Sequence, residues 1–116
     1  MDIYDIWFNL RDGVSDMAFA EAVRAYLDHL KAAGHLASWR LTRRKLGLGP
    51  AFIPEFHLAL EFDGLARLDA AFVSVSTRAD PVEGFHHAVN GKVKDTLFAL
   101  YRDFPDAHRV AGQERF

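Results

Sequence analysis

The sequence contains no cysteine among its 116 residues. Disulfide bonds, thiolate metal ligands and cysteine nucleophiles are therefore excluded, and this composition is typical of a reducing compartment. No apolar run approaches the ~20 residues of a membrane-spanning helix. The first residues carry Asp2 and Asp5 where a signal peptide carries positive charge. These absences predict a cytoplasmic protein that does not act in a membrane.

Neither sign of charge dominates the sequence, because 14 basic and 16 acidic side chains give a formal net charge of −2. A protein without a basic field is a poor binder of nucleic acid, and the one basic cluster, at 40–45, falls in a single predicted strand. The motifs of nucleotide-binding proteins, serine hydrolases and zinc proteases are also missing. We therefore expect no nucleic-acid partner, no cofactor and no metal site.

Core-forming residues, in contrast, are plentiful. Half of the residues are hydrophobic, and 10 residues are phenylalanine. A chain of this size and composition can bury a core without disulfide bonds. We expect residues 1–106 to form a single domain, and residues 107–116, which lack periodicity, to form an irregular C-terminal tail.

Hydrophobic periodicity predicts the element order strand, helix, strand, strand, helix, strand. The strands are predicted at residues 3–10, 36–46, 53–62 and 95–103. The helices are predicted at residues 15–33 and 65–77, with an extra short helix at 82–91 before the last strand. Their apolar stripes are Phe19, Ala22, Val23, Tyr26, Leu27 and Leu30 in the first helix, and Leu65, Leu68, Phe72 and Val75 in the second. This order predicts an α+β, ferredoxin-like βαββαβ fold whose two long helices cover one face of a four-stranded antiparallel sheet.

The opposite face of the predicted sheet is unusual for a solvated surface. Side chains alternate along a strand, so the apolar row of the first strand has Asp5, Trp7 and Asn9 behind it. In the third strand His57 lies on this second face. The last strand is apolar on both faces, and such a strand is normally covered on both. A second copy of the chain is the simplest cover, and we expect a homodimer.

With this element order, these strand lengths and the helical insert before the last strand, residues 2–105 resemble the dimeric α/β-barrel proteins. In this ferredoxin-like superfamily two sheets pack face to face around a shared cavity. The stretch Leu-Tyr-Arg-Asp-Phe-Pro-Asp at 100–106 is similar to small uncharacterised bacterial members. The superfamily includes heme-independent monooxygenases, isomerases, ligand-sensing domains and stress-related proteins. The resemblance implies a dimeric α/β barrel, but it transfers no catalytic residue to this chain.

One group of candidate site residues lies on the face away from the helices. His57 is a candidate general base, with Asn9, Thr42 or Arg44 as its orienting partner, or else a structural histidine of the dimer interface. Trp7 and Asn9 are candidates for an aromatic wall and an amide anchor of a ligand pocket. Alternatively, Trp7 packs against the second copy.

Tyr101 in the last strand has the same two interpretations as Trp7. Arg44, with Arg40, is a candidate ligand for a carboxylate or phosphate, or else a charged residue that protects a sheet edge.

A second group is the sequence His86-His87-Ala88-Val89-Asn90. On a helix, His86 and Asn90 are four residues apart and face the same way. His86 is therefore a candidate base, and His87 and Asn90 are candidate ligand-binding residues. Two imidazoles and an amide are too few ligands for a typical metal site, and helix capping or a solvated surface is the plain alternative.

Two functional hypotheses are compatible with these residues. The first is a cofactor-independent monooxygenase or isomerase that acts on a small hydrophobic or aromatic molecule, with His57 or His86 as the base. The second is a small-ligand-binding or stress-related dimer without enzymatic activity. The sequence alone does not choose between them.

Overall fold

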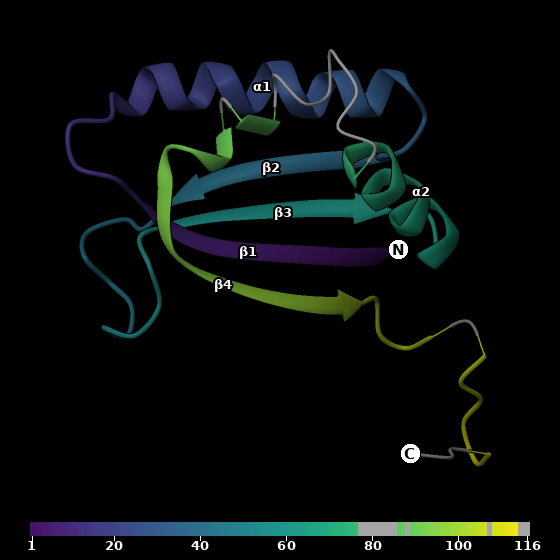
Figure 1. Cartoon of the computed structure of the whole chain (residues 1–116). Coiled ribbons are helices and arrows are strands. Elements are labelled where there is room, and N and C mark those ends of the chain that lie inside the picture. The colour runs from purple at the N-terminus through teal and green to yellow at the C-terminus, as the bar shows by residue number, and fades with distance from the viewer. Residues whose placement is uncertain (77–85, 88, 107, 114–116) are drawn as a thin grey trace.

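The computed structural model describes residues 1–76, 86–87, 89–106 and 108–113. Its elements are, in order, β1 (Asp2–Leu10), α1 (Asp16–Ala32), β2 (Ser38–Arg43), β3 (Phe56–Phe62), α2 (Leu65–Ser76) and β4 (Val93–Arg102). The strands form an antiparallel sheet in the order β2-β3-β1-β4. Both helices lie on the same side of this sheet (Figure 1). The predicted ferredoxin-like βαββαβ fold is confirmed.

Helix α1 begins and ends where the sequence predicts. The Ser15 hydroxyl accepts a hydrogen bond from the N–H of Ala18 at 3.2 Å, which satisfies a free donor of the first turn. Gly34, with φ of 82°, provides the left-handed residue that follows the helix. The buried residues of α1 all belong to the predicted stripe, and they are Phe19, Val23, Leu27 and Leu30.

The stripe of α2 was predicted less well. Leu68 is buried as expected, but Ala71 is buried in place of Phe72, and Leu65 is exposed. Helix α2 lies over one end of the sheet (Figure 1), and its Phe72 meets the Tyr4 ring of β1 at the border of a cavity, where it stays exposed. Half of the short helix predicted at 82–91, residues 82–85 and 88, lies outside the described residues, and residues 86–87 and 89–90 are helical.

The core lies between the helices and the sheet and is rich in aromatic rings. The ring centroid of Phe8 lies 5.3 Å from that of Phe19 and 5.7 Å from that of Phe56. Burying one such side chain stabilises a protein by about 1.5–3 kcal/mol. These rings therefore tie α1 to the two central strands, β1 and β3.

The loop between β2 and β3 is longer than predicted. Strand pairing stops at Arg43 on one side and begins at Phe56 on the other. Leu46 and Gly47 have positive φ angles of 58° and 65°, which turn the chain away from the sheet. Within this loop the Arg44 guanidinium donates hydrogen bonds to the carbonyls of Pro50 and Ile53. Residues 44–55 are named the β2–β3 loop below.

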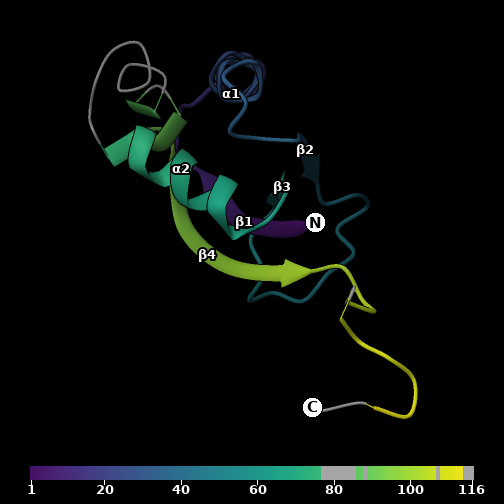
Figure 2. The same ribbon diagram turned by 90° about the vertical axis from the view of Figure 1, so that its right-hand side faces the viewer.

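Strand β4 forms one edge of the sheet and is followed by an arm that leaves the body of the molecule (Figures 1 and 2). Large hydrophobic side chains are exposed on both faces of this strand, and they are Leu97, Phe98, Leu100 and Tyr101. The C-terminal arm (residues 103–106 and 108–113) contains neither helix nor strand. Among the described residues, no helix is long and apolar enough to cross a membrane.

Candidate functional site

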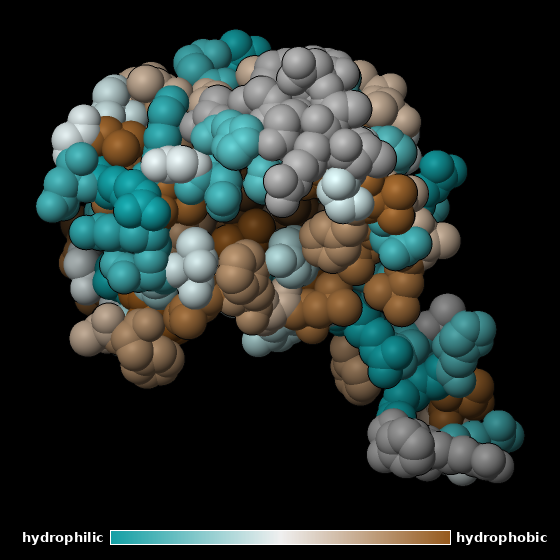
Figure 3. All heavy atoms as spheres, viewed as in Figure 1, coloured by the Kyte–Doolittle hydropathy of each residue, from teal (hydrophilic) through white to brown (hydrophobic). Residues whose placement is uncertain are grey.

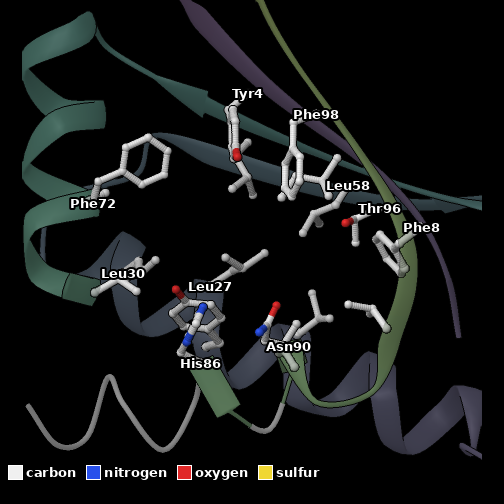
Figure 4. A pocket seen from close by; sticks show the side chains of 18 of the residues that line it. Tyr4, Phe8, Leu27, Leu30, Leu58, Phe72, His86, Asn90, Thr96 and Phe98 are labelled. Atoms are coloured by element: carbon white, nitrogen blue, oxygen red, sulfur yellow. The ribbon is translucent and has the colours of Figure 1, made fainter. Parts of the chain in front are cut away.

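A cavity of about 290 Å³ lies between the helices and the sheet (Figure 4). Aliphatic and aromatic side chains from both helices and from β1, β3 and β4 form most of its lining. Figure 3 shows the surface hollowed between the helix layer and β4, with hydrophobic side chains inside the hollow. The polar side chains of the lining are few, and they are Tyr4, Tyr26, His86, Asn90 and Thr96. An apolar pocket with a few polar groups is typical of small-molecule sites.

His86 and Asn90 line the cavity from one face of their helical segment (Figure 4), as their spacing predicts. The His86 ring packs edge-to-face against Tyr26, with centroids 6.1 Å apart and an interplanar angle of 75°. His86 is half-buried, whereas Asn90 and Thr96 are exposed, so these two residues lie at the mouth of the cavity. His87 is also exposed but does not line the cavity. The arrangement gives His86 access to a molecule bound inside.

The two tyrosines of the lining are hydrogen-bond donors at neutral pH. Burial raises the pKa of Tyr26 to about 12, and burial also raises the pKa of Tyr4. Both hydroxyls therefore keep their protons over the physiological range. Sequence reasoning missed Tyr26 because it belongs to the apolar stripe of α1. The presence of a tyrosine in a stripe of aliphatic residues could have indicated a polar group inside the molecule, since a buried hydroxyl needs a polar partner.

One wall of the cavity is aromatic. The Tyr4 ring stacks against Phe98 with centroids 6.0 Å apart, and it meets Phe72 edge-on at 5.4 Å. All three side chains line the cavity (Figure 4). Flat rings offer wide contact to a planar apolar molecule, and offset stacking adds to the energy of burial.

The face of the sheet opposite the helices, here named the open face, carries a second group of candidates. His57 Nε2 lies 2.7 Å from Asp5 Oδ1, and the His57 ring stacks on Trp7 with centroids 4.8 Å apart. Asp5 is only 7% exposed although it lies on this uncovered side. The expected partners of His57 were wrong: its ring pairs with Asp5, while Thr42 donates only to its backbone carbonyl. The reason is the register between β1 and β3. Trp7 lies directly opposite His57, and Asp5, two residues before Trp7 on the same face, is the diagonal neighbour of His57.

The Asp5–His57 pair should show energetic coupling in a double-mutant cycle. We expect Asp5→Asn and His57→Phe to couple by about 1–2 kcal/mol in the free energy of unfolding, because the first change replaces the carboxylate by a weaker neutral acceptor and the second keeps a ring but removes the nitrogen that faces Asp5. Urea denaturation of the four proteins near neutral pH measures this term. Asp5→Asn combined with Ser38→Ala, which breaks a different hydrogen bond on the same face, is the control and should be additive. Additivity in the Asp5–His57 cycle would contradict the pairing.

The remaining candidates lie apart from the cavity, which none of them lines. Asn9 joins three segments: its Oδ1 accepts from the N–H of Glu55 at 2.9 Å, and its Nδ2 donates to Asp95 Oδ2 at 3.3 Å. Arg44 binds carbonyls of its own loop, and Tyr101 is exposed on the edge strand. The candidates are thus divided between two sides of one sheet. Within the described part of the chain, no group of three acidic or histidine side chains is arranged to hold a metal ion.

Solved structures with this fold come from several organisms. A protein from Arabidopsis thaliana is 12% identical with a TM-score of 0.68, and the match covers 89% of this chain and 95% of that one. A dimeric ferredoxin-like protein of unknown function from Jannaschia sp. CCS1 is 15% identical with a TM-score of 0.66, covering 89% and 100%. The hydroxynitrile lyase from Passiflora edulis is 18% identical with a TM-score of 0.59, covering 86% and 91%. At these identities the likeness shows the fold.

The predicted resemblance to the dimeric ferredoxin-like proteins is confirmed by these structures. No curated protein matches the sequence. One protein-family model does match, and it does so over residues 1–116, the whole chain. The chain, a ferredoxin-like βαββαβ domain with a cavity beneath its helices, belongs to the family of unknown function DUF6614.

Proposed function

We propose that this protein is a cofactor-independent enzyme that acts on a small hydrophobic or aromatic molecule bound between the helices and the sheet. The observation that carries the proposal is the position of His86 beside Tyr26 in a largely apolar cavity of about 290 Å³. Imidazole changes its charge near neutral pH and can therefore both accept and return a proton. An apolar surrounding holds the organic part of a substrate, while the few polar groups orient it.

Isomerisation is the reaction class that these residues support best. His86 removes a proton from a carbon next to a carbonyl, and the electron pair moves onto the carbonyl oxygen as an enolate. The protonated Tyr26 hydroxyl and the Asn90 amide donate hydrogen bonds to that oxygen. In a substrate whose α-carbon is attached to a carbon–carbon double bond, the enolate extends over that double bond, and His86 returns the same proton to its far carbon, so that the double bond moves into conjugation with the carbonyl. This sequence consumes no oxidant and no cofactor, whereas monooxygenation requires dioxygen as a further reactant.

The Passiflora edulis hydroxynitrile lyase supports the enzymatic interpretation in a general way. It is an enzyme whose chain folds like this one over most of its length. A fold can host many unrelated functions, so the reaction proposed for this protein rests on its own cavity.

We further propose that the protein works as a homodimer whose second copy covers the open face. Neighbours from Thermobifida fusca, Jannaschia and Bacteroides fragilis are described as dimeric. The exposed Leu97 and Tyr101 and the half-buried Trp7 lie on this face, and monomers rarely leave such apolar groups contiguous and bare. The ligand cavity then belongs to each subunit, on the other side of the sheet from the dimer contact.

Catalysed hydrogen exchange tests the proposal with simple carbonyl compounds in place of the natural substrate. Small cyclic ketones and enones in heavy water should exchange their α-protons faster with the protein than with buffer, as followed by proton NMR. Thr96→Trp should abolish this acceleration, because Thr96 points into the mouth of the cavity (Figure 4). Lys31→Trp, at an exposed position of α1, is the control and should leave exchange unchanged. Equal exchange rates in the native protein and Thr96→Trp would place the reaction outside the cavity and overturn the proposal.

A further inference from the structure

We propose that the β2–β3 loop and the C-terminal arm grip the second copy of this chain from the two ends of the open face. The inference rests on the homodimer of the proposed function and adds contacts outside the sheet itself. Both segments would bury apolar side chains against the partner.

The two segments border the open face at opposite ends. Each neighbouring pair of strands in the order β2-β3-β1-β4 is antiparallel, so β2 and β4 run in opposite directions. The loop that follows β2 and the arm that follows β4 therefore leave the sheet from opposite ends. Figure 2 shows that both extend to the side of the sheet away from α1 and α2. The open face is thus the floor of a trough, and the β2–β3 loop and the C-terminal arm form the two ends of this trough.

The β2–β3 loop presents apolar side chains on a braced backbone. Phe52 is 77% exposed, and Leu46 and Leu48 are exposed to a similar degree. The hydrogen bonds from Arg44 to two loop carbonyls hold this shape from within. A preorganised loop loses less conformational entropy on binding than a flexible one, which favours a contact role for these side chains.

The arm is fixed at its root and carries two exposed large apolar side chains. The Met1 amino group lies 3.1 Å from Asp103 Oδ2, the N–H of Asp103 donates to the Met1 carbonyl at 3.1 Å, and Arg102 pairs with Asp106 at 3.0 Å. Within this root Phe104 is 81% exposed, and Val110, farther along the arm, is also exposed. These contacts hold the base of the arm in place while its apolar side chains remain bare.

A second copy of the chain is the occupant that fits these features. The trough floor carries the exposed Leu97 and Tyr101, so apolar surface runs from the loop across β4 to the arm. In a two-fold dimer each copy gives one loop and one arm and receives one of each, so every such contact occurs twice. The same surface is continuous with the face that the homodimer covers.

The test compares dimer dissociation constants measured by analytical ultracentrifugation. Phe52→Ser and Phe104→Ser should each raise the dissociation constant by about tenfold or more, because each removes a large apolar contact made twice per dimer. Met17→Ser removes a side chain that is 72% exposed on α1, and it should leave the constant unchanged. Far-UV circular dichroism and melting curves confirm that each variant is folded.

The outcomes separate this inference from the homodimer on which it rests. A native protein that stays monomeric at high micromolar concentration would overturn both. A dimeric native protein whose dissociation constant is the same in Phe52→Ser and Phe104→Ser would overturn the inference alone. In that case Leu97→Asp, on the open face itself, would still weaken the dimer and confirm that the sheets meet.

Discussion

Replacing Phe19 by alanine is expected to lower the free energy of unfolding by about 3–5 kcal/mol, the usual loss for a buried aromatic ring. Phe19 is 1% exposed and packs against the rings of Phe8 and Phe56 at 5.3 and 6.3 Å. It also borders the cavity between the helices and the sheet, so the space left by its ring joins a void that the neighbours do not fill. The site therefore has little capacity to relax, which keeps the loss large.

Urea denaturation followed by circular dichroism measures this loss. Met17→Ala, two residues earlier on the same helix and largely exposed, should change stability by less than about 0.5 kcal/mol. The free energy of unfolding of a domain of this size is only about 5–15 kcal/mol, so Phe19→Ala could fail to fold. Phe19→Leu, which keeps most of the packing, is therefore a second variant. The free energy of unfolding of Phe19→Leu should lie between that of the native protein and that of Phe19→Ala. Equal losses for Phe19→Ala and Met17→Ala would show that this aromatic cluster is not the centre of the core.

Replacing His86 by alanine should slow the catalysed reaction by about 10²- to 10⁴-fold, the usual contribution of a positioned acid–base residue. His86 is the imidazole that lines the cavity, and Tyr26 packs against its ring. Removing it leaves the apolar walls unchanged, so we expect ligand binding to persist while turnover is lost. The exchange assay in heavy water measures the rate, and ligand-induced shifts in melting temperature measure binding.

Two variants separate proton transfer from a structural effect. His87→Ala changes the adjacent histidine, which lies outside the cavity, and should retain the native rate. His86→Gln keeps a hydrogen-bonding group but cannot carry a proton between positions, so it should be as slow as His86→Ala. A fast His86→Gln variant would mean that the side chain only orients the ligand. A slow His87→Ala variant would point to damage of the helical segment rather than to loss of the base.

Local patterns were sufficient to predict the fold. The stripe of α1 and the alternation in β1 and β3 are each set by residues close in sequence, and each fits a single arrangement. The ends of the β2–β3 loop were not predictable in this way. They depend on the positive φ of Leu46 and on hydrogen bonds from Arg44 across the loop, and neither feature has a sequence period.

The candidate site was predictable only in part. The shared direction of His86 and Asn90 follows from helical spacing, and both line the cavity. The position of the cavity did not follow, because periodicity tells which side chains point inward but not where their packing leaves space. Asp5 was missed as the partner of His57 because their contact depends on the pairing of β1 with β3, two strands far apart in the chain.

Strand β1 takes part in both proposed roles through alternate residues. Tyr4 and Phe8 point to the cavity side, while Asp5 and Trp7 point to the open face. A single inserted or deleted residue in this strand would exchange the two sets, placing a carboxylate in the cavity and phenyl rings on the open face. Point substitutions do not have this effect. During evolution, substitutions on one side of β1 can therefore change the proposed ligand specificity without changing the proposed dimer contact, and the reverse also holds, provided that the length of the strand stays fixed.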